Sequence, residues 1–291
     1  MAWSDRIDLE YESDVECLAF RPDGRELLAA SLKISRWDPS TGSRVGTYDY
    51  WAHAISYSPD SRTIGIAESG AVHVIEVDSG ARMRTLKGSG RCAFSPAGDL
   101  LALPAADGIQ LWDTAKWQVM GTLRKPWSET KAIAFSADGR YMAAGGLGKD
   151  VIAVLDLATG ETQELATGDW VMSAAFSADG SILAVGVTNY RVRLWRLPSC
   201  EVVLDRRNGR AAVCSLAFSR DGRILAVGEQ AVTLLDMTTL TPLGHCGSYQ
   251  DRGVQGLAFS PDGRLLASTC GAFVALEDPS RPRWQASSGP A

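Results

Sequence analysis

Short runs of apolar residues alternate with polar ones along most of the chain, which is the pattern of half-buried β-strands. One combination recurs: an apolar run that ends in an aromatic residue, a Ser-Pro-Asp-Gly turn, and a second run of small apolar residues. Its clearest copy is AFSPDGRLLA, at residues 258–267. Proline presets φ at the second turn position, aspartate can bond its own backbone, and glycine accepts a positive φ. Each copy therefore predicts a tight turn between two strands.

The chain contains seven copies of this unit, separated by 37, 37, 41, 41, 42 and 41 residues. The aromatic residues that end the first strands are Phe20, Tyr57, Phe94, Phe135, Phe176, Phe218 and Phe259. A repeat of this length, made only of strands and turns, is typical of a β-propeller with one blade per repeat. We therefore expect an all-β fold, a seven-bladed β-propeller of four-stranded antiparallel blades, formed as one domain by residues 1–291.

Two copies depart from the turn sequence. Ser61 replaces the turn glycine in the second copy, and Ala97 replaces the aspartate in the third. We expect these two turns to be the least regular.

The ring needs a strand to complete its last blade. Residues 6–10 alternate polar and apolar, precede the first repeat, and are expected to form the outer strand of blade seven, which covers a sheet edge and closes the ring. Residues 283–286 are the alternative for this place, although Pro282 and the Ser/Gly/Pro tail disfavour a strand there.

A third strand follows in each repeat and ends in Trp or another apolar residue, then Asp in most repeats, then a Ser/Thr/Gly turn. Trp37-Asp38 and Trp112-Asp113 are two such endings. With the Ser-Pro-Asp-Gly turns and the repeat length, these endings make the chain resemble the WD-repeat β-propeller family over essentially its whole length. The resemblance implies blades arranged around a channel, with the outer strand of each blade supplied by the start of the next repeat. It also implies a rigid, non-catalytic interaction platform.

The chain also departs from this family. The Gly-His pair that normally precedes the first strand occurs only as Gly244-His245, and the aspartate before the third strand is clear only at Asp107. The family's His–Ser–Asp–Trp hydrogen-bond network therefore cannot form in most blades, and we expect apolar packing to hold the blades together.

Composition narrows the function classes. The chain has 34 Asp and Glu against 29 Lys and Arg, a net charge of −5, which argues against a dedicated nucleic-acid binder. The first ten residues contain no apolar run, and no stretch approaches the roughly 20 apolar residues that span a membrane. The six cysteines form no C-x-x-C pair. We expect them to be reduced structural thiols, and the protein to be cytoplasmic.

Signals for catalysis are weak. The three histidines, His53, His73 and His245, fall in different repeats and at different points of the repeat, so they do not predict a metal site. Residues 145–149 superficially suggest a phosphate loop but lack the following hydroxyl residue and the strand-to-helix context. We therefore expect no enzymatic activity, no cofactor and no metal.

The loops of one propeller face carry the candidate binding residues. This face, called the top face below, bears the loops that join each outer strand to the next inner strand and the turns between second and third strands. Aromatic residues and arginine are enriched at interface hot spots. The candidate partner-binding residues are Trp51, Trp127, Trp170, Tyr190, Arg207, Arg210, Tyr249 and Arg252. For each tryptophan the alternative is that it caps its own blade.

The sequence thus predicts a protein-interaction scaffold that binds another protein or peptide on its top face, as a subunit of a multiprotein assembly. One alternative is a hydrolase-like or lactonase-like propeller enzyme with a site in the central channel. Another is the binding of an acidic or phosphorylated segment by the arginine-rich loops of blades five to seven, where Arg206 accompanies Arg207, Arg210 and Arg252. The sequence does not indicate an oligomeric state.

Overall fold

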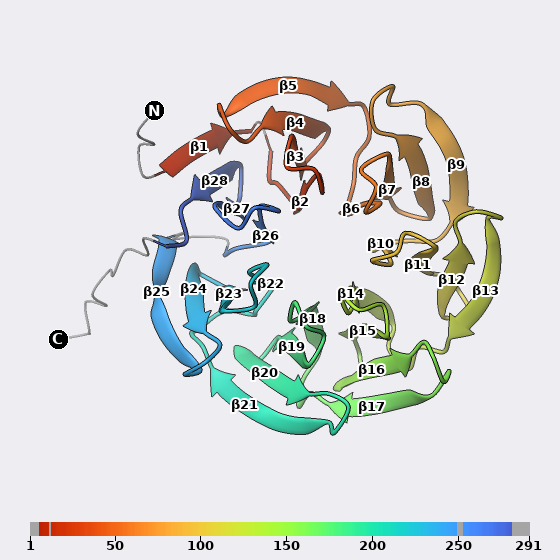
Figure 1. The fold of residues 1–291 in the computed structure, drawn as a ribbon, viewed down its shortest axis with the longest axis vertical. Helices are drawn as coiled ribbons and strands as arrows, with labels where there is room; N and C mark the ends of the chain where they lie inside the picture. Colours follow the sequence, from red (N-terminus) through yellow and green to blue (C-terminus); the bar gives the residue numbers. More distant parts are fainter. Residues whose placement is uncertain (1–5, 12, 249–252, 281–291) are drawn as a thin grey trace.

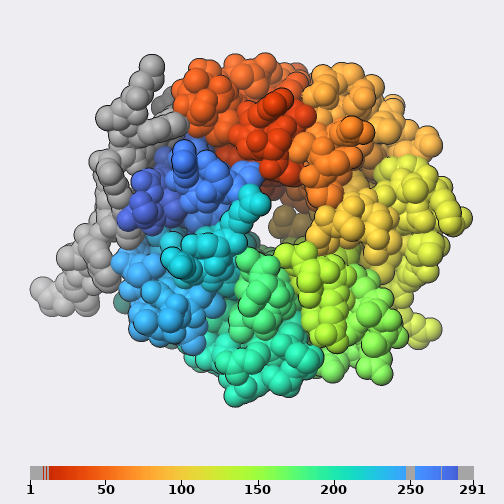
Figure 2. Space-filling view, viewed as in Figure 1, coloured from red at the N-terminus to blue at the C-terminus, as the bar shows by residue number. Residues whose placement is uncertain are grey.

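The computed structural model describes residues 6–11, 13–248 and 253–280. They form seven four-stranded antiparallel sheets arranged as blades of a ring (Figure 1). The space-filling view shows an opening at the centre of this ring (Figure 2). The predicted β-propeller is therefore confirmed. None of the described residues belongs to a helix of the length and apolarity that a membrane span requires.

The two inner strands of each blade are the hairpins predicted from the repeat. All seven innermost strands end at the predicted aromatic residue. In blade order these are β2 (Cys17–Phe20), β6 (Ala54–Tyr57), β10 (Ala93–Phe94), β14 (Glu129–Phe135), β18 (Val171–Phe176), β22 (Ser215–Phe218) and β26 (Leu257–Phe259). The second strands are β3 (Leu27–Ala30), β7 (Thr63–Ala67), β11 (Leu100–Pro104), β15 (Tyr141–Leu147), β19 (Ile182–Val187), β23 (Ile224–Gly228) and β27 (Leu266–Cys270).

The two outer strands complete each blade. The third strands are β4 (Ile34–Asp38), β8 (Ala71–Glu76), β12 (Ile109–Asp113), β16 (Val151–Asp156), β20 (Arg191–Arg196), β24 (Ala231–Asp236) and β28 (Phe273–Glu277). The outermost strands are β5 (Ser43–Tyr48), β9 (Arg82–Lys87), β13 (Gln118–Leu123), β17 (Thr162–Ala166), β21 (Glu201–Arg207), β25 (Thr241–Ser248) and, in blade seven, β1 (Arg6–Glu10).

The ring is closed by the N-terminal strand, as the sequence predicts. β1 pairs antiparallel with β28, from Arg6 opposite Glu277 to Glu10 opposite Phe273. Figure 1 shows β1 beside β28 at the junction between the last and first blades. The rival segment, residues 283–286, lies outside the described residues.

Apolar side chains between neighbouring blades form the core. The cluster between blades four and five includes Ile152, Val171 and Leu183, all fully buried, and Phe176 packs against it while remaining partly exposed. Second and third strands are covered on both faces by the adjoining blades, so their residues are mostly buried, whereas outer strands expose one side. Cohesion between blades therefore rests on apolar contacts.

A serine and an aspartate hold the turn after most inner strands. In blade five, Ser177 Oγ donates to Asp179 Oδ1 at 2.5 Å and accepts the N–H of Ile182 at 2.9 Å. The carboxylate also accepts the N–H of Ser181 at 3.0 Å. This fixed arrangement explains why the turn sequence recurs along the chain.

The expectation that the second and third turns would be the least regular is wrong. Ser61 adopts the positive φ of the replaced glycine, 63°, and Ser58 Oγ still donates to Asp60 at 2.6 Å. In the third copy Asp99 supplies the carboxylate that Ala97 lacks, because it accepts from Ser95 Oγ at 2.6 Å. A carboxylate two residues later in the chain thus reaches the same serine.

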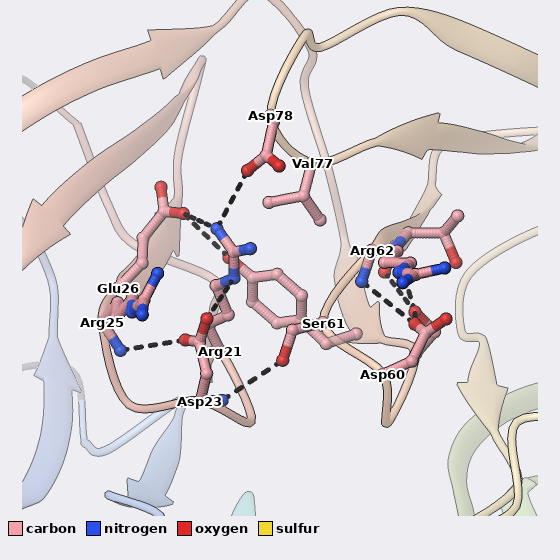
Figure 3. Close-up of polar contacts among 12 residues, drawn as sticks. Arg21, Asp23, Arg25, Glu26, Asp60, Ser61, Arg62, Val77 and Asp78 are labelled. Atoms are coloured by element: carbon pink, nitrogen blue, oxygen red, sulfur yellow. Dashed lines mark hydrogen bonds and ion pairs between the residues drawn. The ribbon is translucent and has the colours of Figure 1, made fainter.

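The turn that differs most is in blade one, where Arg21 occupies the serine position (Figure 3). Arg21 lies 3.0 Å from Asp23 and 3.3 Å from Asp78, which belongs to blade two. Glu26, only 3% exposed, accepts a hydrogen bond from Arg36. A cluster of charges replaces the serine-aspartate pair here and connects the first two blades.

We expect removal of inter-blade side chains to destabilise the whole ring. Leu183→Ala should lower the free energy of unfolding by about 2–5 kcal/mol, and Phe176→Ala by about 3 kcal/mol, the low end for a buried aromatic because its ring is partly exposed. Chemical denaturation of both variants measures this. An unchanged midpoint for Leu183→Ala would contradict the packing described here.

We also expect the turn aspartates to make the fold acid-labile. Hydrogen bonds from Ser177, Ser219 and Ser260 hold the pKa of Asp179, Asp221 and Asp262, respectively, below the usual range. Their contribution to stability is present above about pH 3.9, the unfolded value, and is lost as pH falls through the lower folded values. Asp179→Asn should therefore be less stable than wild type at pH 7, and the difference should shrink by pH 3. Urea denaturation at both pH values measures this; a difference that stayed constant would exclude the role of ionisation.

Candidate functional site

A cavity of about 710 Å³ lies at the top-face mouth of the channel. It is lined by one residue from each blade at the same point of the repeat, four residues before the inner-strand aromatic. These residues, called the mouth ring, are Glu16, His53, Gly90, Lys131, Met172, Cys214 and Gln255. Because the inner strands start here, the repeat itself directs each of these positions toward the mouth.

The mouth ring has different chemistry on its different sides. Glu16 and His53 lie on blades one and two, and Nδ1 of His53 is 2.9 Å from Glu16 Oε2. Lys131 lies on blade four and pairs with Glu129 at 2.6 Å. Blades five to seven contribute neutral side chains, beginning with Met172. The cavity therefore offers charged groups on one side and uncharged ones on the other.

Arg91, next to Gly90, is a further cation of the cavity wall, which also includes Lys125 and Lys131. Its Nη1 donates to the carbonyl oxygen of His53 at 3.4 Å, and it forms no ion pair with a described residue. Burial raises the pKa of the Cys17 and Cys92 thiols to about 12, and the charge of Arg91 offsets a smaller part of this rise. Arg91 also acts on Cys214, whose pKa burial likewise raises. The charge of Arg91 thus acts on thiols of blades one, three and six.

Two of the predicted tryptophans lie at the surface. Trp51 is 38% exposed and Trp170 is 46% exposed. The Trp51 ring lies edge-on to His53, with ring centroids 4.2 Å apart, so it adjoins the mouth ring. The predicted docking face therefore has an exposed indole beside the cavity.

Trp127 is a correction to the predicted set. It is 3% exposed, its Nε1 donates to Thr130 Oγ1 at 3.1 Å, and it packs in the cluster that includes Ile109 and Met142. Trp127 lies eight residues before its aromatic, whereas Trp51 and Trp170 lie six before theirs. The longer spacing places its ring between blades, so Trp127 caps its blade and is not available to a partner.

Three further predicted residues, Tyr190, Arg207 and Arg210, do not line the cavity. Arg207 is exposed and its guanidinium stacks 5.3 Å from the Tyr190 ring centroid, and Arg210 is exposed on the next loop. Tyr249 and Arg252 lie outside the described residues. The arginine-rich alternative therefore has Arg207 and Arg210 near one another in sequence, but neither side chain lines the cavity, to which this loop contributes only Cys214.

The loop that carries Arg210 is fixed by a buried carboxylate. Glu229 is 5% exposed, and its pKa is raised, chiefly by burial. It accepts a hydrogen bond from Asn208 and from the backbone N–H groups of Arg210 and Ala211, which lower the pKa less than burial raises it. Glu229 thus holds this loop in place, and its role is structural.

Glu16 and Arg91 were not among the binding residues predicted from the sequence, although Arg91 belongs to a loop of the predicted top face. Their signal is positional: they lie four and three residues before Phe20 and Phe94. Aligning the repeats on their aromatics would have found them.

The described residues contain no group of three or more His, Cys, Asp or Glu placed to hold a metal ion. His73 bonds Thr85 at 3.0 Å, and His245 bonds Thr233 at 3.1 Å, both away from the cavity. The chemistry concentrated at the mouth is therefore that of charges, hydroxyl groups and one imidazole.

Comparisons with known proteins agree with this architecture. Residues 161–196 and 237–273 match the family model described as WD domain, G-beta repeat. WD repeat-containing protein SL1-17 of Schistosoma mansoni is 29% identical over 200 residues, 65% of this chain and 50% of that protein. Pre-mRNA-processing factor 19 homolog 2 of Arabidopsis thaliana is 25% identical over 215 residues, 66% of this chain and 39% of that protein.

A third relative, telomerase protein component 1 of Mus musculus, is 34% identical over 106 residues, 36% of this chain and 4% of that protein. The chain thus spans half or less of the length of these curated relatives. The repeat matches and the seven four-stranded blades together confirm the resemblance found in the sequence. Residues 161–196 and 237–273 are thus similar to WD repeats, and the whole ring has the seven-bladed architecture that this resemblance implies.

Proposed function

We propose that this propeller is a protein-interaction module that binds a segment of a partner protein at the top-face mouth, within a multiprotein assembly. The observation that carries the proposal is the composition of the mouth ring. The inner-strand aromatic position is aromatic in all seven blades, whereas the position four residues earlier is different in every blade. If packing constrained this position, similar residues would recur there in every blade. The variation in residue type therefore indicates a surface that is not needed for the fold.

Size and surroundings support this role. A cavity of about 710 Å³ accommodates a few side chains of a bound segment. Trp51 extends the surface beyond the rim, and Arg91 offers a guanidinium that can form bidentate hydrogen bonds with a carboxylate. One of the relatives reported above is named as a pre-mRNA-processing factor and another as a WD repeat-containing protein. The proposal includes a cytoplasmic location, which is the one expected from reduced cysteines.

The proposal is tested by removing two charges at the mouth. The variant Arg91→Ala/Lys131→Ala should lose at least about tenfold of its binding to partners, since truncation of an arginine at an interface hot spot costs about 2 kcal/mol or more. The matched control is Arg223→Ala/Arg264→Ala, which removes two charges from side chains that are 83% and 85% exposed on the opposite face. Quantitative co-purification from the native host compares the three proteins.

Partners that the mouth variant loses and the control retains would support the proposal. Equal recovery by wild type and by the folded mouth variant would contradict it. Loss only in the control would move the interface to the opposite face.

A further inference from the structure

Three side chains at the mouth form a hydrogen-bonded row. Nδ1 of His53 is 2.9 Å from Glu16 Oε2, and Nε2 of the same ring is 3.3 Å from Ser69 Oγ. One tautomer satisfies both contacts: Nδ1–H donates to Glu16, and the Nε2 lone pair accepts the Ser69 hydroxyl proton. This is the order of groups that activates a serine for nucleophilic attack: hydroxyl, imidazole, carboxylate.

The imidazole is held in place from several sides. The backbone N–H of His53 donates to the carbonyl of Ala67 at 2.9 Å. The Trp51 ring packs edge-on against the imidazole, and Arg91 donates to the His53 carbonyl at 3.4 Å. A general base works only if its ring is oriented toward the proton it receives, and these contacts provide that orientation.

Ser69 is accessible and faces the cavity. It lies in the turn between β7 and β8, which the hydrogen bond from Glu68 N–H to the Ala71 carbonyl closes at 2.9 Å. Gly70 completes this turn with a φ of 88°, a conformation that favours glycine. Ser69 is exposed, and both Ser69 and Gly70 line the cavity of about 710 Å³. A small molecule in the cavity can therefore reach the hydroxyl.

A second row of a hydroxyl, an imidazole and a carboxylate lies in blade two, away from the cavity, and serves as a comparison. His73 bonds Thr85 at 3.0 Å and lies 3.5 Å from Glu68, but neither His73 nor Thr85 lines the cavity. That row has a longer carboxylate contact, and none of its three residues lines the cavity. The row at the mouth has the shorter carboxylate contact and lines the cavity, with the cation of Arg91 in the same wall.

We propose that Ser69, His53 and Glu16 form a nucleophilic relay that cleaves esters of small carboxylic acids. Ser69 Oγ forms a bond to the ester carbonyl carbon while its proton passes to Nε2 of His53. Glu16 stabilises the imidazolium, and Arg91 stabilises the negative charge on the carbonyl oxygen. The bond between the carbonyl carbon and the ester oxygen then breaks, and the leaving alcohol takes the proton from Nε2.

Water completes the cycle. It attacks the acyl carbon on Ser69 while His53 Nε2 takes one of its protons. The bond between the acyl carbon and Oγ breaks, Oγ recovers that proton, and the carboxylic acid leaves. Atoms and charge balance without an oxidant, a reductant or a metal.

A fluorophosphonate probe tests the first step, because it forms a bond to an activated serine oxygen with loss of fluoride. Intact mass and peptide mapping should show one adduct per chain, on Ser69. Ser69→Ala should abolish labelling, and His53→Gln should slow it on the order of 100-fold, the range for loss of a general base. Glu16→Gln should slow it by roughly tenfold, because the imidazole remains while its partner loses charge.

Two further measurements make the test decisive. Thr85→Val, which removes the hydroxyl beside His73, should label at the wild-type rate. Release of p-nitrophenol from p-nitrophenyl acetate should follow the same order of variants, and thermal unfolding checks that each variant is folded. Labelling at another residue, an undiminished rate in folded His53→Gln, or equal ester cleavage by wild type and Ser69→Ala would overturn the proposal.

The outcome is independent of the interaction role. Ser69→Ala removes no charge from the mouth, so partner recovery should be unchanged whether or not the serine reacts. If Ser69→Ala no longer cleaves the ester but still recovers its partners, the result would support the relay. If Ser69→Ala still cleaves the ester but loses its partners, the result would contradict the relay.

Discussion

The structure depends on face-to-face apolar packing of neighbouring blades, and on the closure that lets this packing continue around the whole ring. A row of repeats that stayed open would leave one apolar face uncovered at each end. Here the first and last blades cover each other: Leu27 and Ala29 of blade one are fully buried in a cluster with Ala267 and Leu276 of blade seven. β1 fixes this junction, since its pairing with β28 places Leu9 in the same cluster.

Closure also determines where function can reside. The inner strands are held by packing on both sides and by the serine-aspartate turns at one end. Few residue types therefore fit at their positions. Their other ends open into the mouth, where side chains meet solvent and not a neighbouring blade. Glu16, Lys131 and Met172 occupy the same point of three repeats yet differ in charge and size. A rigid ring can tolerate this variety because stability is provided elsewhere in each repeat.

The features that depend on the backbone pattern were predicted correctly from the sequence. The wrong predictions concern positions where the contacts of a single side chain determine the outcome. Blade number, inner strands and the closing strand follow from periodicity and alternation, and all were found. The second and third turns were expected to be irregular, but Ser61 accepts a positive φ and Asp99 substitutes for the missing aspartate. Trp127 was placed at the surface from loop position, yet two residues of additional spacing bury its ring between blades. The turn outcomes depend on local backbone and side-chain geometry, and the burial of Trp127 depends on packing between blades, so the apolar pattern alone predicts neither.

The mouth ring shows which contacts can be predicted by aligning the repeats and which cannot. Equivalent positions of adjacent blades are neighbours around a ring, so the residues four before each aromatic can be read as a circular order in which Glu16 precedes His53. That order makes the two positions neighbours, and in the structure Nδ1 of His53 lies 2.9 Å from Glu16 Oε2. Ser69 does not follow from it, because it lies on the turn between the second and third strands, and the reach of that turn depends on its own conformation at Gly70. The imidazole–carboxylate pair is therefore a consequence of the repeat, whereas the hydroxyl beside it is a feature of one local turn.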